Sequence, residues 1–519
     1  MAFMTTSRLF LLTAILLPTL LLAQAPDEIG KLREQIAAQQ KQLDEQRKAL
    51  ETAQQALDRQ QKLLEQLASA PAAPAQLAPG AASPATPPAT GTAQVDNKGR
   101  AFSPLAFHIG GADFAPGGFV DFATVWRSTN VGSGIATSFG AIPFSNTAAG
   151  RLTEIRSSAQ NSRLSLKVTE SPTKNVTLTG YVEADFWGTQ PTGGYVTSNS
   201  NTLRMRQYWV NVQKGRWEVL GGQGWTLLTP NRVGASSVPS DLFIGLEQDS
   251  NYLVGLPWAR QGQLRLVFHP DKKWSIAASI ENPEQFVTTA TTVPAFASTQ
   301  VSNGSATSTP NVVPDFVAKA AYDTKVGGKA FHVEAAGLWR HFRTSPAAGV
   351  HYNAQGFGGS FNSSLEIFKN FRLVETAFVS SGGGRYILGL APDLTVGPDG
   401  SISPVHALSG IAGFEYAPDP KSQIYAYYGG DYFRRNYTVV SPGSYLGFGF
   451  PGSSNAANRQ IQEASFGYIR TFWKNPNYGA LQLVTQYSYV TRAPWWVAAG
   501  SPTSAHAHMV FTSVRFTLP

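Results

Sequence analysis

The 519-residue chain contains no cysteine, which excludes a disulfide scaffold, a thiolate nucleophile and a thiolate metal site. Charged residues make up only 14% of the chain, whereas a soluble domain usually carries about 25%. This shortfall leaves a large uncharged surface that needs a partner, and lipid is one such partner. Beyond residue 25 no stretch approaches about 18 unbroken apolar residues, so we expect no transmembrane helix in the mature chain.

The common catalytic motifs are also missing. The chain has no HExxH, no GxSxG and no Walker loop, and the glycines of "GGQGWT" lie within a predicted strand rather than before a helix. The eight histidines are scattered, and His506 and His508 would supply only two ligands to a metal. We therefore expect no enzymatic activity, no metal and no cofactor.

Residues 1–25 have the pattern of a secretory signal peptide. A short segment with Arg8 precedes an apolar run from Leu9 to Leu22 and an Ala-x-Ala end. The alternative, an uncleaved membrane anchor, is disfavoured because the run is short and Pro18 interrupts it. The mature chain is therefore expected to be exported.

Residues 26–68 are predicted to form a coiled coil. An aliphatic residue recurs at every seventh position over six heptads, and a lone amphipathic helix rarely keeps so strict a period. Basic and acidic side chains balance in this segment, which argues against a nucleic-acid-binding arm. Its role is therefore oligomerisation, although the heptads do not determine the number of strands. The expected contact residues are Ile29, Leu32, Ile36, Leu43, Leu50, Leu57, Leu64 and Leu67.

Residues 69–100 are predicted to be a linker, because six prolines between Pro71 and Pro88 favour extended chain over a packed core. The pattern then changes to a period of two. "NVTLTGYVEADFWG" places Val182 and Ala184 on one face and Glu183 and Asp185 on the other. Such segments are about ten residues long, the length of a tilted membrane-spanning strand. Residues 101–519 are therefore expected to form an all-β transmembrane domain.

Sixteen segments carry this pattern, and their connections alternate in length. Every second connection is short, such as "KG", "KN" and "APDP", whereas the others are mostly long and rich in Gly, Ser, Thr, Asn and Pro. This asymmetry is typical of a 16-stranded antiparallel outer-membrane β-barrel with turns at the periplasm, which also places both termini there. The expected strands are 117–128, 158–168, 175–187, 203–213, 216–226, 258–268, 273–281, 314–322, 329–342, 355–368, 371–380, 406–416, 421–433, 461–473, 479–490 and 507–518.

Five successive blocks resemble those of DcaP-like outer-membrane porins. They are "SRLSLKV" (162–168), "GYVEADFWG" (180–188), "LRMRQYWV" (203–210), "WEVLGGQGWTLL" (217–228) and "RQGQLRLVF" (260–268). The likeness is best over residues 117–281 and includes the N-terminal coiled coil. It implies a homotrimer of 16-stranded barrels in the bacterial outer membrane that takes up small anionic solutes, such as dicarboxylates, by passive diffusion. One departure is the C-terminus "VRFTLP", where porins usually end on an aromatic residue.

The candidate pore residues are basic. Residues 101–519 hold 31 basic and 24 acidic side chains, and a positive lumen would favour anions. Alternation directs Arg163, Lys167, Arg265, Arg340 and Arg515 inward, and the resemblance adds Arg206 and Arg260. The alternative is that these cations only hydrate the channel and pair with carboxylates such as Glu183 and Glu334.

The connection 227–257 is the third long loop, and this loop narrows the channel in many porins. Arg232, Asp241, Glu247 and Asp249 would then lie at the constriction. The alternative is a surface loop that caps the barrel or touches another subunit.

Tryptophans near the predicted strand ends suit the interfacial girdles of a membrane barrel, rather than a line of aromatic faces that guides sugars. They are Trp126, Trp187, Trp217, Trp258, Trp274, Trp339 and Trp473.

The sequence thus predicts an anion-preferring porin with lipid as its surroundings and no nucleic-acid partner. Two other functions stay open: a weakly selective porin or one that prefers phosphate or sugars, and a structural anchor whose periplasmic coiled coil contacts the cell wall.

Removal of residues 26–68 tests the coiled coil. If this segment clasps the subunits, the shortened protein is expected to lose its trimer band at a lower temperature in detergent electrophoresis, because the heptad contacts are gone. Trimers of unchanged stability would assign the segment to spacing or to contact with the cell wall.

Overall fold

The computed structural model describes residues 104–188, 199–237, 253–287, 300–302, 311–388 and 390–519. The chain divides into two compact units, Met1–Thr90 and Gly91–Pro519, and every described residue belongs to the second. The predicted signal peptide, coiled coil and linker therefore lie outside the described residues. Within the described ranges, no helix is both long and apolar enough to cross a membrane.

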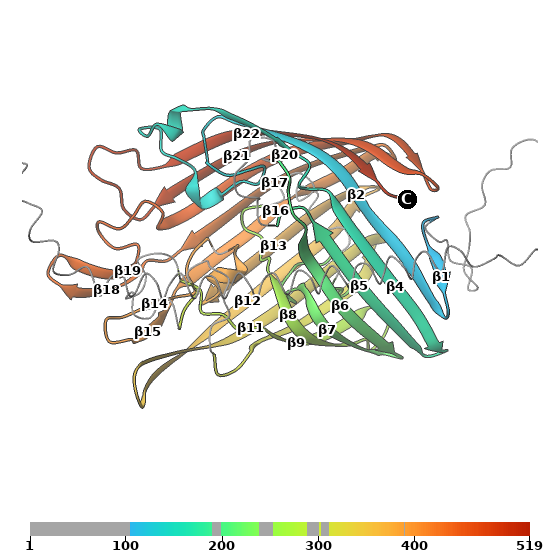
Figure 1. Ribbon diagram of the computed structural model, residues 1–519, viewed down its shortest axis with the longest axis horizontal. Coiled ribbons are helices and arrows are strands. Elements are labelled where there is room, and N and C mark those ends of the chain that lie inside the picture. Colours follow the sequence, from blue (N-terminus) through green and yellow to red (C-terminus); the bar gives the residue numbers. More distant parts are fainter. Residues whose placement is uncertain (1–103, 189–198, 238–252, 288–299, 303–310, 389) are drawn as a thin grey trace, which may run out of the picture. The chain divides into compact units, whose positions relative to one another are not determined.

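Sixteen antiparallel strands form the wall of a barrel (Figure 1). Each is offset from its sequence-predicted range by a few residues at most ends, so the prediction of sixteen strands is confirmed. They are β2 (Ala112–Arg127), β4 (Arg163–Thr173), β5 (Val176–Asp185), β6 (Arg204–Lys214), β7 (Trp217–Trp225), β8 (Arg260–Phe268), β9 (Trp274–Glu281), β10 (Asp315–Val326), β11 (Lys329–Ala347), β12 (Val350–Phe368), β13 (Phe371–Ser381), β16 (His406–Asp419), β17 (Ser422–Phe433), β20 (Asn458–Asn475), β21 (Gly479–Pro494) and β22 (Ala505–Thr517).

The first and last strands of the wall close the barrel. Residues Phe119–Arg127 of β2 pair with Met509–Thr517 of β22, and the opposite edge of β2 pairs with β4 from Ala112 to Phe119. Every wall strand therefore has a hydrogen-bonded neighbour on both sides. Closure matters because an unpaired backbone amide or carbonyl in hydrocarbon costs several kcal/mol, at an order of magnitude.

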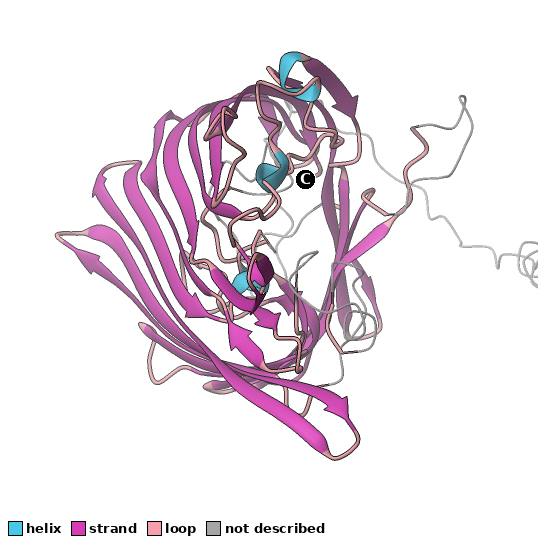
Figure 2. Cartoon of the chain, turned by 90° about the vertical axis from the view of Figure 1, so that its left-hand side faces the viewer, coloured by secondary structure: helices cyan, strands magenta, loops and turns pink. Residues whose placement is uncertain are grey.

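The remaining elements extend the wall or decorate its loops. β1 (Phe107–Ile109) and β3 (Glu154–Ser158) both pair with β2. The hairpins β14–β15 (Leu394–Val396 and Ile402–Pro404) and β18–β19 (Asn436–Ser441 and Ser444–Phe448) belong to long connections, as do the short helices η1 (Phe139–Ala141), η2 (Ala149–Arg151) and η4 (Gly384–Tyr386). Figure 2 shows loop segments lying within the ring of strands.

The two faces of the strands differ in polarity as the alternation predicts. On β5, Val182 is exposed on the outer face while Glu183 is buried on the inner face. On β8, Leu264 is exposed and Arg265 is buried. This pattern arises because successive side chains on a strand point to opposite faces, so an apolar–polar period of two yields an apolar belt outside and a polar wall inside.

A bulge on β6 interrupts this alternation at one functional position. Glu183 pairs with Gln207, whereas the next residue Ala184 pairs with Met205, so Arg206 is the extra residue. Arg206 and Gln207 are consequently both buried on the inner side, and Tyr208 returns to the outer face. Arg204 and Arg206 share the parity of the outward Tyr208, so the bulge is what turns both guanidinium groups into the lumen.

The short connections lie at one end of the barrel, together with both ends of the chain that the structure describes. Ala112 pairs with Glu170 close to the β4–β5 turn, and Thr517 pairs with Ala480 close to the β20–β21 turn. Outward aromatic pairs such as Trp217–Phe268 and Trp274–Tyr322, with ring centroids 4.4 and 4.7 Å apart, follow these turns. They have the position and chemistry of an interfacial girdle.

Two tryptophans depart from the girdle prediction. Trp258 is buried and packs against Trp225 with ring centroids 3.8 Å apart. Trp187 packs against the buried apolar cluster, and its indole Nε1 donates a hydrogen bond to Asn161. Trp187 follows the end of β5 and Trp258 precedes the start of β8, so a position near a strand end did not determine the face that either residue occupies. The other five tryptophans lie on the outer side of the wall.

An alanine at Gly467 is expected to destabilise the barrel. Gly467 of β20 pairs with Tyr425 of β17, and a Cβ there would lie 2.0 Å from Cζ of the fully buried Tyr425 ring. Gly467→Ala should lower the free energy of unfolding by about 1–3 kcal/mol through overpacking. This is measured as the temperature at which the folded barrel loses its compact band in detergent electrophoresis. Gly337→Ala is the control, because nothing lies near a Cβ there, and equal temperatures for the two variants would contradict the prediction.

Candidate functional site

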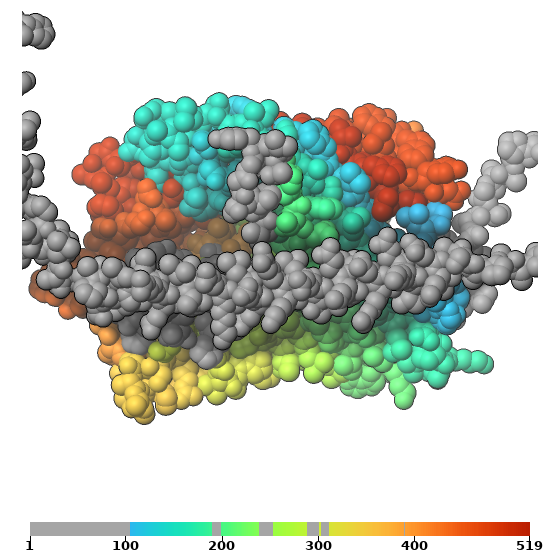
Figure 3. Space-filling view, viewed as in Figure 1, coloured from blue at the N-terminus to red at the C-terminus, as the bar shows by residue number. Residues whose placement is uncertain are grey.

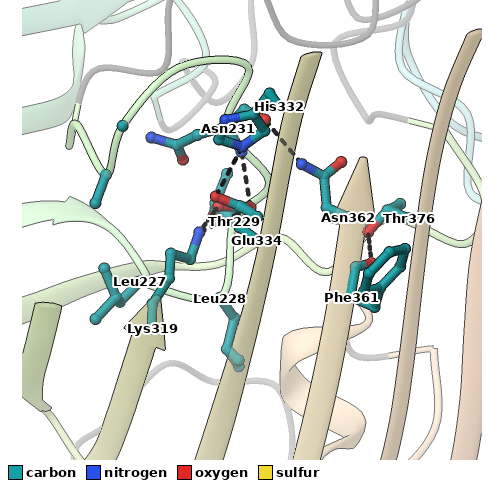
Figure 4. Close-up of polar contacts among 12 residues, drawn as sticks. Leu227, Leu228, Thr229, Asn231, Lys319, His332, Glu334, Phe361, Asn362 and Thr376 are labelled. Atoms are coloured by element: carbon teal, nitrogen blue, oxygen red, sulfur yellow. Dashed lines mark hydrogen bonds and ion pairs between the residues drawn. The ribbon is translucent and has the colours of Figure 1, made fainter. Parts of the chain in front are cut away.

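The connection between β7 and β8 enters the barrel and is bonded to its inner wall (Figure 4). The backbone N–H of Asn231 donates to Glu334 of β11 at 3.0 Å, and Asn362 of β12 donates from Nδ2 to the carbonyl of Asn231 at 2.8 Å. Glu334 and Asn362 are inward residues of strands that lie far from β7 around the wall. The described part of this connection therefore lies in the lumen rather than over the rim.

A buried lysine strengthens this attachment. Nζ of Lys319 on β10 donates to the carbonyl of Thr229 at 2.8 Å and pairs with Glu334 at 3.0 Å. All three residues are buried. A buried charge without a partner is costly, so Lys319 and Glu334 are expected to stay paired. Their hydrogen bonds to Thr229 and Asn231 then fix the loop backbone against the wall.

Arg232 attaches the connection between β7 and β8 to β16. Its guanidinium pairs with Glu415 of β16 at 3.1 Å. Arg372 of β13 pairs with the second carboxylate oxygen of Glu415, and the hydroxyl of Tyr427 donates to the first at 2.7 Å. One carboxylate thus joins a loop arginine, a wall arginine and a tyrosine.

The returning half of the connection contacts a different stretch of wall. The N–H of Val254 donates to Glu463 of β20 at 3.1 Å. Gly255 has φ 97° and lies against β16 so closely that a Cβ would be 2.1 Å from the carbonyl oxygen of Gly410. Only glycine fits this conformation and this approach. The described parts of the connection thus contact β10, β11, β12, β16, β17 and β20.

Two cavities flank this segment at Val233 and Gly234. The larger has a volume of about 510 Å³ and extends from Arg232 to the short-turn end of β10–β17, where Asn370 and Gln423 line it. The smaller, of about 230 Å³, lies toward β6–β9 and is lined by Arg265, Glu218 and His269 among others. The loop segment is the partition between them.

A second group of charges lies on the wall on either side of the closure. Arg515 pairs with Asp121 at 2.8 Å, and Arg206 bridges Glu183 at 2.6 Å and Asp185 at 2.8 Å. Arg204 also pairs with Asp185, and Arg163 lies 3.8 Å from Glu183. We call Arg163, Lys167, Arg204, Arg206 and Arg515 the cationic wall. Its five cations face three carboxylates, so the formal charge of the group is +2 (5 − 3).

The members of the cationic wall differ in access. Arg206 and Arg515 are buried by their partners, whereas the Arg163 and Arg204 side chains are each 33% exposed and Lys167 is exposed. Arg163 and Arg515 both lie over the ring of Phe119, at 5.3 and 4.2 Å from its centroid. A solute in the lumen would reach the three exposed cations first.

The other predicted arginines have different surroundings. Arg265 is buried and donates to Gln263 and to the carbonyls of Ala235 and Trp225, so it supports the loop from below. Arg340 is fully buried between Asp315 at 2.9 Å and Asp393 at 2.8 Å. Its guanidinium therefore fastens the connection after β13 and has no surface to offer a solute.

Arg260 is half-buried at the start of β8, beside the buried ring of Trp225 that Arg206 also approaches, at 5.5 Å from the centroid. It shares the parity of the exposed Leu264 and Leu266, and its guanidinium lies 5.6 Å from the ring centroid of Trp225. Alternation had not selected this residue, and only the family resemblance suggested it. Asp241, Glu247 and Asp249 lie outside the described residues.

Sequence reasoning missed Arg204, Arg372 and Glu415. Alternation along "FRLVETAF" already places Arg372 on the face opposite Leu373, and alternation along "IAGFEYA" does the same for Glu415. Arg204 alternates only with the exposed Leu203 and Met205 before the bulge, whereas the parity of Tyr208 after it would have placed Arg204 outside. The alternation in the sequence thus indicated the face of Arg372 and Glu415, but it did not indicate the ion pairs that all three residues form across strands. Among the described residues, no group of three or more potential ligands could hold a metal ion.

Comparison with known proteins gives structural neighbours only. No protein-family profile matches the chain, and no curated protein matches it. The outer membrane channel DcaP of Acinetobacter baumannii is similar with a TM-score of 0.57 and 17% identity, over 78% of this chain and 97% of that one. An anion-selective porin from Comamonas acidovorans has a TM-score of 0.45 and 11% identity, over 78% of this chain and 99% of that one. The first likeness supports the porin-like barrel fold, in agreement with the sixteen strands.

Glu415→Gln is expected to raise anion preference. The substitution removes the carboxylate that neutralises Arg232 and Arg372, so two guanidinium groups beside the larger cavity gain net charge. The ratio of chloride to potassium permeability should rise roughly twofold or more in planar bilayers. Glu375→Gln removes a carboxylate from the outer face instead and should leave the ratio unchanged. A ratio unaltered by Glu415→Gln would show that the pair lies away from the ion path.

Proposed function

We propose that this chain is an outer-membrane porin through which small hydrophilic anions, including dicarboxylates, diffuse passively. The observation that carries the proposal is the placement of the cationic wall inside a closed barrel, opposite a loop segment that is fastened in the lumen. Guanidinium groups suit carboxylates because their fork of donors matches two oxygens.

The outer surface supports the location. The exposed apolar side chains Val210, Leu266, Ile276 and Phe316 face outward from β6, β8, β9 and β10. Such a belt is costly in water and stable in hydrocarbon, and the closed hydrogen-bonded wall meets the requirement of lipid for paired backbone groups.

Arg232, with Asp241, Glu247 and Asp249 further along the same connection, is proposed to narrow the pore. The bonds of Asn231, Arg232 and Gly234 to β10, β11 and β16 support this role, since they keep the segment in the lumen. The accessible cations Arg163 and Lys167 are proposed to meet the solute, while Arg206, Arg265 and Arg515 keep the wall and the loop in place.

The assembly is proposed to be a homotrimer with the coiled coil of residues 26–68 in the periplasm. The described chain begins at the short-turn end of the barrel, which supports a periplasmic position for the preceding segment. Contact of this segment with the cell wall is a further part of the proposal.

The reversal potential in a potassium chloride gradient across a planar bilayer tests the function. The wild-type protein should favour chloride, and Arg163→Gln combined with Lys167→Gln should lower the chloride preference roughly two- to fivefold, because two accessible positive charges leave the lumen. Lys272→Gln with Lys273→Gln, in the β8–β9 turn, is the matched control. Succinate should reduce the chloride current of the wild type more than that of the lumen variant.

The opposite outcomes identify the alternatives. Preference for potassium would overturn anion selectivity, equal currents for all small ions would indicate a weakly selective porin, and absence of conductance from a folded barrel would favour the structural anchor.

A further inference from the structure

Lysine and arginine are segregated between the two ends of the barrel. Residues 101–519 contain eleven lysines, and none lies in a long connection. Nine are in or beside the short turns, and the other two, Lys167 and Lys319, are within strands. The cations of the long-loop end are arginines and histidines, so the two rims of the barrel have different binding chemistry.

Three of these arginines form one exposed group at the loop end of β16, β17, β20 and β21. The guanidinium of Arg435 lies 5.5 Å, and that of Arg459 5.9 Å, from the ring centroid of Trp495. The N–H of Arg434 donates to the carbonyl of His406 at 2.9 Å, which brings a fourth basic side chain to the same rim. We call Arg434, Arg435, Arg459, His406 and Trp495 the rim patch.

The backbone directs the rim patch outward. Trp495 follows the inward, buried Arg492 by three positions and contacts the outward Tyr432, with ring centroids 6.2 Å apart. Its indole Nε1 donates to the carbonyl of Phe433 at 2.9 Å, which fixes the ring. Asn458 and Gln460 pair with Pro494 and Ala493, so Arg459 is the extra residue of a bulge and is exposed while Asn458 is buried inward.

No carboxylate neighbours the arginines along their own segment. Residues 432–462 contain no aspartate or glutamate, and the flanking Asp431 and Glu463 are buried on the inner face. In the lumen, by contrast, Arg206, Arg340 and Arg515 are paired with acids. Within the described part of the chain, no ion pair involves Arg434, Arg435 or Arg459, so the rim patch presents positive charge on the outer side of the barrel.

An apolar strip lies below the rim patch on the same strands. The outward side chains Leu408, Tyr428, Tyr432 and Phe466 are all exposed, and Gln460 and Gln462 lie between Arg459 and Phe466 on β20. From the loop end toward the middle of the barrel, the surface thus changes from cationic to polar to apolar. In Figure 3 the orange and red loop segments lie at the left-hand end of the described unit.

We propose that the rim patch binds the phosphate groups of a phosphorylated glycolipid of the outer leaflet, of the acylated diglucosamine class, whose acyl chains cover the strip below. This inference rests on the proposed location in an outer membrane. Phosphate oxygens fit the guanidinium fork, the face of Trp495 keeps Arg435 and Arg459 in place, and an amphipathic lipid matches the sequence of cationic, polar and apolar surface. A soluble phosphate would satisfy only the first of these features.

Binding of purified lipid A to the refolded full-length protein in detergent tests the proposal. Dissociation constants are measured for lipid A and for the same lipid after removal of both phosphates. The wild type should bind the phosphorylated lipid roughly tenfold more tightly or better, and Arg435→Gln with Arg459→Gln should abolish most of this difference. Lys272→Gln with Lys273→Gln removes the same charge from the opposite rim and should bind lipid A like the wild type.

Three outcomes would overturn the inference: equal affinity for phosphorylated and dephosphorylated lipid, equal loss in the turn variant and the rim variant, or displacement of lipid A by millimolar inorganic phosphate alone. The compact band in detergent electrophoresis shows that each variant is folded. Chloride selectivity of the rim variant should equal that of the wild type, so failure of glycolipid binding and failure of the proposed channel function are distinguishable.

Discussion

The pairing of every wall strand with two neighbours is the constraint on which the rest of the structure depends. Hydrocarbon offers no partner to a backbone N–H or C=O, so a sheet can lie in it only when its edges meet. Here β2 meets β22, and the short β1 and β3 occupy the remaining edge positions of β2. The closed wall then determines which side chains share an interior, including pairs such as Asp121 and Arg515 that are nearly 400 residues apart in sequence.

Inside this wall, buried charges organise the loops. Glu334 holds both Lys319 and the backbone of Asn231, Glu415 joins Arg232 to Arg372, and Arg340 lies between Asp315 and Asp393. Each contact removes the cost of an unpaired charge and at the same time attaches a connection to the wall. Most lumen arginines therefore act as fasteners, and the few that remain accessible, Arg163 above all, are the ones suited to meet a solute.

The outer side follows a different logic. The apolar belt matches hydrocarbon, lysines occupy the short-turn rim, and arginines with an aromatic ring occupy the loop rim. A long flexible ammonium extends readily toward water, whereas a guanidinium on a fixed ring presents directed donors. Basic side chains thus occupy three environments in this barrel. Most of those in the lumen are bonded to carboxylates or carbonyls, those at the short turns are solvated, and those of the rim patch face outward without a described ion pair.

The sequence by itself determined the number of strands, their alternation and the end at which the short turns lie, because a period of two and turn chemistry are local properties. It also indicated that Arg163, Lys167, Arg265, Arg340 and Arg515 face inward. Only the tertiary structure decided which of them are accessible, since burial of Arg340 depends on Asp315 and Asp393, which meet only after the barrel closes. The bulge at Arg206, the inward course of Trp187 and Trp258, and the bond of Arg232 to Glu415 depend likewise on cross-strand register and on long-range pairing, neither of which a local pattern contains.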